Sequence, residues 1–279
     1  MSESQPQQVP TLTSLPLLPL ASHSESSSPI EHPNWYFIHT ISSLLTHEEC
    51  ESIIASHQNL VPANATPTTK RDREIFDDAD LADKVWSRME RFYVKEVGIE
   101  GGRVQDEDGQ WWVVKDLNPR WRLARYEAGG RFSPHQDGRR FVSLDSQSFM
   151  TVNIYLNTVP ASLGGATRAL CEPPAGNILS EEIKVLGKVQ PEIGMGAVFR
   201  DCLWHDGEAL REGIKYLLRT DIMYEREVPF EEWDAIGDGA RGRKALAMAE
   251  GFEDAGNYDE AVKWYKKAFR LAPELERGA

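Results

Sequence analysis

The chain has 279 residues, of which 27% are charged, and its formal net charge is −13. This length suffices for one large domain or two ordinary ones, and the negative charge argues against non-specific binding of nucleic acid or of an anionic membrane. An acidic or phosphate-bearing substrate would therefore need a local basic pocket.

The cysteines and the N-terminal segment indicate in which cellular compartment the protein is expected to reside. The three cysteines, Cys50, Cys171 and Cys202, have no C-x-x-C spacing, as in proteins of a reducing compartment. No apolar run approaches membrane-spanning length, and the short apolar patch near the N-terminus is interrupted by prolines and lacks the basic residues of a signal peptide. We expect a cytoplasmic or nuclear protein without a membrane segment.

Residues 1–32 are rich in Ser, Pro and Gln. Such a segment cannot bury enough apolar surface to offset the entropy lost on ordering, so we expect a disordered tail. Order is expected to begin at a short strand over 34–38. Thr46 and Glu49 then form a capping-box pattern that opens a first helix.

A Pro/Thr/Asn-rich loop is predicted at 61–69. Apolar residues at helical spacing predict a second helix over 81–97 that packs on the core. The acidic run over 72–83 is interpreted as a solvated surface and the N-terminus of that helix.

From about Trp111 the helical period ends, and short β-type segments alternate with Gly and Pro. Many short strands of this kind, preceded by two helices, predict a β-sandwich or jelly roll with helical support. The expected fold class is therefore α+β, mainly β, with one domain over 33–229. The segments predicted as strands are 110–114, 121–126, 149–156, 166–170, 183–189, 197–199 and 214–224.

Beyond Pro229 the pattern becomes helical again, and residues 230–279 form a C-terminal segment. Residues 241–274 predict a helical hairpin whose small and aromatic residues have the spacing of one tetratricopeptide repeat. A single repeat cannot bury its own apolar face, and arrays need about three repeats. The hairpin is therefore expected to dock, either on this protein's own sheet or on a partner or a second copy of the chain.

His135 and Asp137 follow a Gly-Gly turn and are separated by one residue. Residues i and i+2 of an extended chain point to the same side, so this pair offers an imidazole and a carboxylate to one metal ion. His205 lies downstream at the end of a predicted strand pair and is the candidate third ligand. Two histidines and one carboxylate leave open positions at the metal, as in non-haem Fe(II) oxygenases.

A 2-oxo acid that chelates such a metal needs a buried cation for its far carboxylate. Lys215 and Arg219 are both candidates, because they lie four residues apart on one face of the same predicted strand. A lone H-x-D pattern is weak evidence. Its combination with a Gly-Gly-x-Thr turn at 164–167, a later histidine and a strand cation is much more specific.

With these motifs, residues 34–226 resemble the 2-oxoglutarate- and Fe(II)-dependent dioxygenases, most closely the prolyl 4-hydroxylase catalytic domains. The resemblance implies a double-stranded β-helix, a jelly roll that holds the metal at one mouth. It also implies that Fe2+ binds to His135, Asp137 and His205 and that Lys215 binds the carboxylate of 2-oxoglutarate. The matching segments are 126–137, 151–156, 164–167, 189–194 and 205–216.

The resemblance leaves further residues with more than one interpretation. Tyr126 matches an aromatic hydroxyl beside the cosubstrate, and it could equally serve packing. Arg219 and the two residues after it resemble the R-x-S element of other dioxygenase branches, so it stays a candidate anchor. Arg139 and Arg140 either form surface salt bridges or guide an anionic group or a peptide carbonyl of the substrate to the iron.

The activity that the resemblance implies is hydroxylation of a C–H bond by dioxygen, with release of succinate and CO2. A protein side chain such as proline is then the expected substrate, and ascorbate is a further cofactor that the resemblance suggests. Two alternatives stay open. The jelly roll could be an inert scaffold for protein interaction, or it could be a cupin-like metal enzyme that does not use 2-oxoglutarate.

Overall fold

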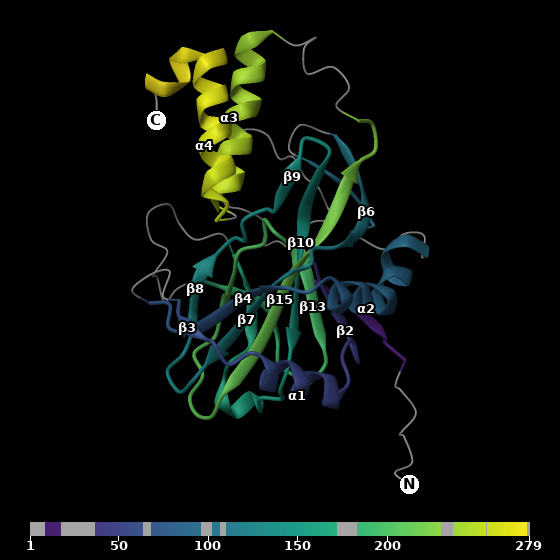
Figure 1. Cartoon of the computed structure of the whole chain (residues 1–279). Helices are drawn as coiled ribbons and strands as arrows, with labels where there is room; N and C mark the ends of the chain where they lie inside the picture. Colours follow the sequence, from purple (N-terminus) through teal and green to yellow (C-terminus); the bar gives the residue numbers. More distant parts are fainter. Residues whose placement is uncertain are drawn as a thin grey trace.

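The computed structural model describes residues 9–17, 37–63, 68–95, 102–106, 110–171, 183–229, 237–254 and 256–277. It is mainly β, with helices beside the larger of two sheets and a helical hairpin at the C-terminal end (Figure 1). The strands are β1 (Leu12–Pro16), β2 (Phe37–Ile41), β3 (Val61–Pro62), β4 (Asp72–Asp77), β5 (Arg103–Gln105), β6 (Trp111–Leu117), β7 (Arg120–Tyr126), β8 (Phe132–His135), β9 (Phe141–Ser143), β10 (Ser146–Tyr155), β11 (Thr167–Leu170), β12 (Val185–Val189), β13 (Gly196–Arg200), β14 (His205–Gly207) and β15 (Lys215–Arg226). The helices are α1 (His47–Ser56), α2 (Ala79–Glu90), α3 (Asp238–Asp254) and α4 (Tyr258–Leu271), with a π-helical turn η1 (Arg91–Lys95) and the 3-10 turns η2 (Ala161–Leu163) and η4 (Pro273–Arg277).

The larger sheet has the strand order β1-β2-β13-β10-β15-β7-β4-β3, with β6 beside β15, β5 beside β6 and β9 beside β10. The smaller sheet has the order β12-β11-β14-β8. All the strand pairs are antiparallel. Apolar residues of both sheets pack together in one core, so the sheets face each other as the two layers of a jelly roll. The predicted fold class is confirmed.

Side chains of the larger sheet alternate between its two faces, because successive residues of a strand point to opposite sides. On β15, Leu218 and Ile222 pack beneath the helices. Lys215, Leu217 and Arg219 instead face a cavity between the sheets. This alternation places the cavity-lining side chains on one face of β15 and the core-packing apolar side chains on the other.

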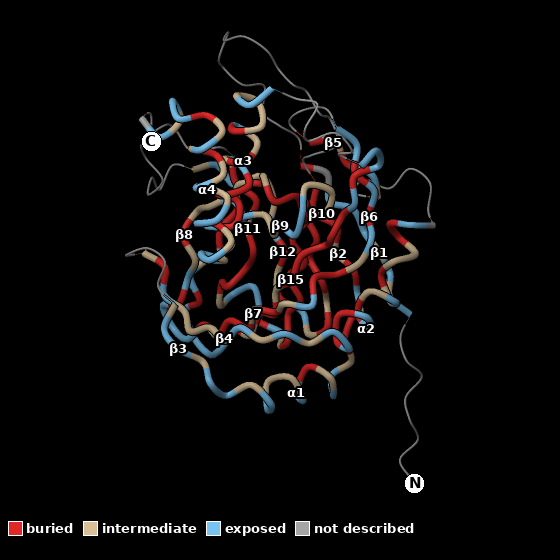
Figure 2. Tube along the Cα trace, turned by 45° about the horizontal axis from the view of Figure 1, so that its top comes forward, coloured by how far each residue is buried: buried red, intermediate tan, exposed pale blue. Residues whose placement is uncertain are grey.

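The helices cover the outer face of the larger sheet. Helix α1 begins at the predicted capping box, in which the Glu49 amide donates to the Thr46 hydroxyl at 3.2 Å and the Thr46 amide donates to the Glu49 carboxylate at 2.9 Å. Helix α2 buries Leu81, Val85 and Met89 against the sheet. Figure 2 shows that the buried positions concentrate in the central strands, while α1 is largely exposed on its outer side. No helix in the described part of the chain is long and apolar enough to span a membrane.

Two expectations for the N-terminal third are wrong in part. Residues 12–16 lie in the expected disordered tail, yet they form β1, which pairs with β2 at the edge of the sheet. The burial of Leu17 next to this strand supplies an apolar contact that the composition of the tail did not suggest. Residues 72–77, interpreted as a solvated surface, form β4 and pair with β7, and the Asp72 carboxylate accepts a hydrogen bond from Arg125. Residues 1–8 and 18–32 of the expected tail lie outside the described ranges.

The C-terminal helices α3 and α4 form the expected hairpin, which stands at one end of the sheets beside β9 (Figure 1). Phe252 of α3 lies near Phe141 of β9, with ring centroids 6.3 Å apart. Gly251 allows this approach, because a Cβ atom there would lie 2.0 Å from the Phe141 ring. The hairpin therefore packs on the protein's own sheet, while docking on a partner or a second copy stays a prediction.

Candidate metal centre

Three side chains from the smaller sheet converge on one point between the two sheets. His135 ends β8 and His205 begins β14, and these two residues are directly paired in the sheet. Asp137 follows two residues after His135. The Asp137 carboxylate oxygens lie 3.6 Å from His135 Nε2 and 3.5 Å from His205 Nε2. The structure thus brings together the three residues that the sequence assigned to a metal.

Backbone carbonyls hold both imidazoles in the orientation that a metal requires. His135 Nδ1 lies 2.8 Å from the carbonyl oxygen of Ser133, and His205 Nδ1 lies 2.9 Å from that of Leu203. A carbonyl can only accept, so each Nδ1 carries the proton and each Nε2 lone pair faces Asp137. Burial, and secondarily the neighbouring His135, lower the pKa of His205 to about 4, which keeps that imidazole neutral at pH 7.

Asp137 remains ionised although it is buried. Burial alone would raise its pKa, but the Arg219 guanidinium, the largest opposing influence, holds the pKa of this carboxyl well below its usual range. Arg219 Nη2 lies 3.2 Å from one Asp137 oxygen, and the Thr151 hydroxyl donates to the other at 2.6 Å. Arg219 also pairs with Asp221 at 3.0 Å. These contacts orient the carboxylate toward the histidines.

The donor set fits a divalent transition metal. Ligand atoms about 2.1 Å from one ion and at right angles to each other would be separated by about 3 Å, close to the distances found here. All three candidate ligand atoms lie within 4.8 Å of one another. Two imidazoles and one carboxylate on one side would leave the opposite side of a bound ion open toward the cavity.

The cavity beside this centre has a volume of about 220 Å3 and is lined by both sheets. Lys215 lies in its wall with 2% of its surface exposed, and its ammonium donates to the carbonyl oxygen of Gly165 at 2.6 Å. The φ angle of Gly165 is +76°, a conformation that favours glycine, and the Gly-Gly turn aims this carbonyl at the lysine. Burial lowers the pKa of Lys215 to about 8.

The other residues singled out from the sequence differ in their relation to the cavity. Tyr126 lines it, and the Lys215 ammonium lies 5.1 Å from the centre of its ring. Arg139 and Arg140 are not among the described residues that line the cavity. Arg139 forms an ion pair with Asp201 and lies over the Phe149 ring, 4.6 Å from its centre. This arrangement corresponds to the salt-bridge interpretation of Arg139.

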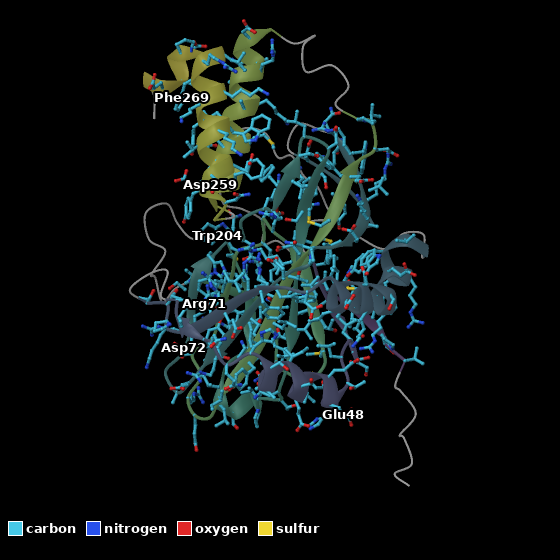
Figure 3. All side chains as sticks on the ribbon, in the orientation of Figure 1. Glu48, Arg71, Asp72, Trp204, Asp259 and Phe269 are labelled. Atoms are coloured by element: carbon cyan, nitrogen blue, oxygen red, sulfur yellow. The ribbon has the colours of Figure 1, made fainter. Side chains whose placement is uncertain are left out.

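Three cavity-lining arginines were not identified from the sequence. Arg71 directly precedes β4, Arg73 is the second residue of β4, and Arg122 comes from β7. Figure 3 labels Arg71 at the end of β4 that lies below β8. No local pattern marks these residues as functional, because they meet only through the pairing of β4 with β7.

No protein-family model and no curated protein sequence matches this chain. Its structural neighbours are prolyl hydroxylases and other 2-oxoglutarate/Fe(II) oxygenases, the group that the sequence motifs resemble. The viral collagen prolyl hydroxylase of Paramecium Bursaria Chlorella virus-1, in its 2OG complex, is 17% identical, with 69% of this chain and 96% of that chain covered and a TM-score of 0.43. A Pseudomonas putida prolyl-4-hydroxylase is 17% identical, with 68% and 93% covered and a TM-score of 0.45. HygX from Streptomyces hygroscopicus, with nickel, 2-oxoglutarate and hygromycin B bound, is 14% identical, with 68% and 83% covered and a TM-score of 0.42.

Proposed function

We propose that this protein is an Fe(II)- and 2-oxoglutarate-dependent dioxygenase that hydroxylates a C–H bond. The observation that carries the proposal is the convergence of His135, Asp137 and His205 at one side of a cavity that also contains the buried cation Lys215. In the overall reaction, the substrate, 2-oxoglutarate and dioxygen give the hydroxylated substrate, succinate and CO2. One oxygen atom enters each organic product, and the decarboxylation of the 2-oxo acid supplies two electrons.

The three protein ligands would hold Fe(II), which supplies the open coordination positions and the redox chemistry for dioxygen when it is bound. His135 and His205 present their Nε2 atoms, with the rings fixed by Nδ1–H···O=C hydrogen bonds. Asp137 supplies the anionic ligand. Thr151 and Arg219 position that carboxylate rather than contact the reacting atoms.

Lys215 is the better anchor for the far carboxylate of 2-oxoglutarate. Its ammonium is buried, and no carboxylate of the described residues forms an ion pair with it. A bound carboxylate would therefore satisfy a buried charge that the protein leaves without an anionic partner. Arg219 is less suited to this role, because its guanidinium already pairs with Asp137 and Asp221.

Tyr126 and the walls of the cavity would orient the cosubstrate and exclude water. Tyr126 lies beside Lys215 and is 3% exposed. The Tyr155 hydroxyl donates to Thr167 at 2.8 Å, which fixes the opposite wall near the Gly-Gly turn. Such fixed walls restrict the reacting groups to a productive geometry. A prolyl side chain remains the substrate suggested by sequence resemblance alone.

The proposal is tested by adding Fe(II) and 2-oxoglutarate to the protein without oxygen and recording the visible charge-transfer band of the chelate. Oxygen and ascorbate are then admitted, and succinate is measured. We expect the wild type to give both signals and His135→Ala to lose both. The matched control is His47→Ala on the exposed surface of α1, where the side chain is 62% exposed.

The two alternatives give different results in the same experiment. An inert scaffold would give neither the band nor succinate, and His135→Ala would leave its partner binding intact. A metal enzyme that does not use 2-oxoglutarate would bind iron through the same three residues, and replacing Lys215 would leave its activity unchanged, whereas replacing Arg219 would disturb the ligand Asp137 in either case. Either result would reject the proposed function.

A further inference from the structure

The cavity contains more positive charge than the proposed cosubstrate needs. The side chains that line it include five cations and two carboxylates, an excess of three positive charges. A divalent metal and the dianion 2-oxoglutarate would cancel each other, so this excess would remain after both had bound. The cations are Arg71, Arg73, Arg122, Lys215 and Arg219, and the carboxylates are Asp137 and Asp206.

Internal ion pairs compensate only part of this charge. Asp221 lies behind the wall and pairs with Arg122 at 3.3 Å and with Arg219 at 3.0 Å. Asp206 pairs with Arg168, with an N···O distance of 2.5 Å, and is thereby neutralised. These carboxylates therefore leave the region around Arg73 positive.

Arg73 is a cavity-lining arginine that no carboxylate of the described residues pairs with. It is half-buried on β4, and its guanidinium makes no hydrogen bond or ion pair that the described residues show. Burial, and then the repulsion of Arg71 and Arg219, lower its pKa. The neighbouring arginines raise the electrostatic cost of the Arg73 charge. An anion bound here would therefore be attracted by Arg73 and by its neighbouring arginines together.

Arg71 links this positive region to the metal centre. Its guanidinium lies over the Phe132 ring at 3.7 Å from the centroid, and the His135 ring also lies beside Phe132, with ring centroids 3.8 Å apart. The arginine region and the metal ligands thus share one small cavity. A group bound at Arg73 would therefore lie in the same cavity as the metal ligands.

We propose that Arg73, flanked by Arg71 and Arg122, forms a second anion subsite that binds the prime substrate, and that this substrate is a small molecule with a carboxylate or phosphate group near the oxidised C–H bond. This inference rests on the proposed function and specifies its substrate class. A small anion is favoured over a neutral peptide segment because the cavity has a volume of about 220 Å3 and must also admit the cosubstrate. Carboxylate and phosphate share the geometry that guanidinium groups recognise.

The subsite is tested on the full chain, loaded with Fe(II) and saturating 2-oxoglutarate without oxygen. Inorganic phosphate and, separately, acetate are titrated in at constant ionic strength, and binding is followed by calorimetry. We expect at least one anion to bind the wild type and to bind Arg73→Gln at least tenfold more weakly. Arg73→Lys should bind within a fewfold of the wild type, and the exposed control Arg270→Gln on α4 should be unchanged. The anion that binds more tightly identifies the substrate group.

The affinity for 2-oxoglutarate, measured in the same proteins, separates the possible outcomes. The inference predicts less than a twofold change in Arg73→Gln. A tenfold loss would assign Arg73 to the cosubstrate and overturn the subsite. Anion binding that persists in Arg73→Gln would place the anion at the metal and overturn the subsite. Absence of anion binding to the wild type would also overturn the subsite. A wild type that binds no 2-oxoglutarate would instead refute the proposed function.

Discussion

Replacement of Lys215 by Met tests the centre of the argument, because it removes the ammonium while largely keeping the volume of the side chain. The lysine is 2% exposed, so a carboxylate bound to it would be a buried charge pair. Truncation of one partner of such a pair costs about 2–5 kcal/mol. At about 1.4 kcal/mol for each factor of ten, the dissociation constant of 2-oxoglutarate should rise at least about 30-fold.

The same substitution should stabilise the protein in the absence of 2-oxoglutarate. The pKa of Lys215 is about 8 in the fold, against 10.5 ordinarily. This difference corresponds to about 3 kcal/mol of unfavourable burial of the charge below pH 8. The lost hydrogen bond to the Gly165 carbonyl offsets about 1 kcal/mol of that gain. A net gain of about 2 kcal/mol at pH 7 is expected.

Two measurements check this pair of effects. Anaerobic titration of the Fe(II) protein with 2-oxoglutarate gives the affinity, and denaturant unfolding of the cosubstrate-free protein gives the stability. Lys188→Met is the matched control, since Lys188 is exposed on β12. A variant that binds 2-oxoglutarate like the wild type would refute Lys215 as the anchor. A variant that is less stable than the wild type at pH 7 would refute the argument about its buried charge.

Three further outcomes are expected. In the wild type, 2-oxoglutarate binding should weaken as pH rises through about 8, where Lys215 loses its proton. The stability of the cosubstrate-free protein should rise between pH 8 and 10.5, because the unfolded chain then holds more protons than the folded one. An affinity for 2-oxoglutarate that does not vary over this pH range would contradict the role of Lys215. Thr151→Val should lower the affinity for iron about 10- to 100-fold, because it removes the hydrogen bond to Asp137. Competition with a chelator measures this affinity, and an unchanged value would show that Arg219 alone orients the carboxylate. Gly251→Ala should destabilise the protein by about 1–3 kcal/mol through its clash with Phe141, and calorimetry should show that this cost disappears in a Phe141→Ala background.

The metal centre could be identified from the sequence because its ligands obey short-range rules. His135 and Asp137 are separated by one residue, and the extended chain at β8 keeps both on one side. The alternation of side chains along β15 likewise predicts that Lys215 and Arg219 lie on one face. Lys215 and Arg219 do line one cavity. Which of them anchors the cosubstrate and which supports Asp137 depends on the contacts of Arg219 with Asp137 and Asp221, and no local sequence pattern records these contacts.

The arginine region could not be found in this way. Arg73 lies among acidic residues that suggested a solvated surface, and β4 reaches the cavity only by pairing with β7, almost 50 residues further along the chain. Strand β1 was missed for a similar reason, because its partner β2 is separated from it in sequence. Pairings over such distances depend on the packing of the whole sheet rather than on local propensity.

The ion pair between Arg219 and Asp137 connects the metal centre to the register of β15. A buried carboxylate without partners would become protonated, whereas Arg219 keeps Asp137 ionised and ready to bind a metal. Lys215 lies four residues away on the same face, so one strand positions both the support of a metal ligand and the proposed cosubstrate anchor. A shift of one residue in the pairing of β15 would turn both cations away from the cavity. The long antiparallel pairing of β15 with β10 and β7, and the apolar residues on its opposite face, therefore secure the proposed chemistry as well as the fold.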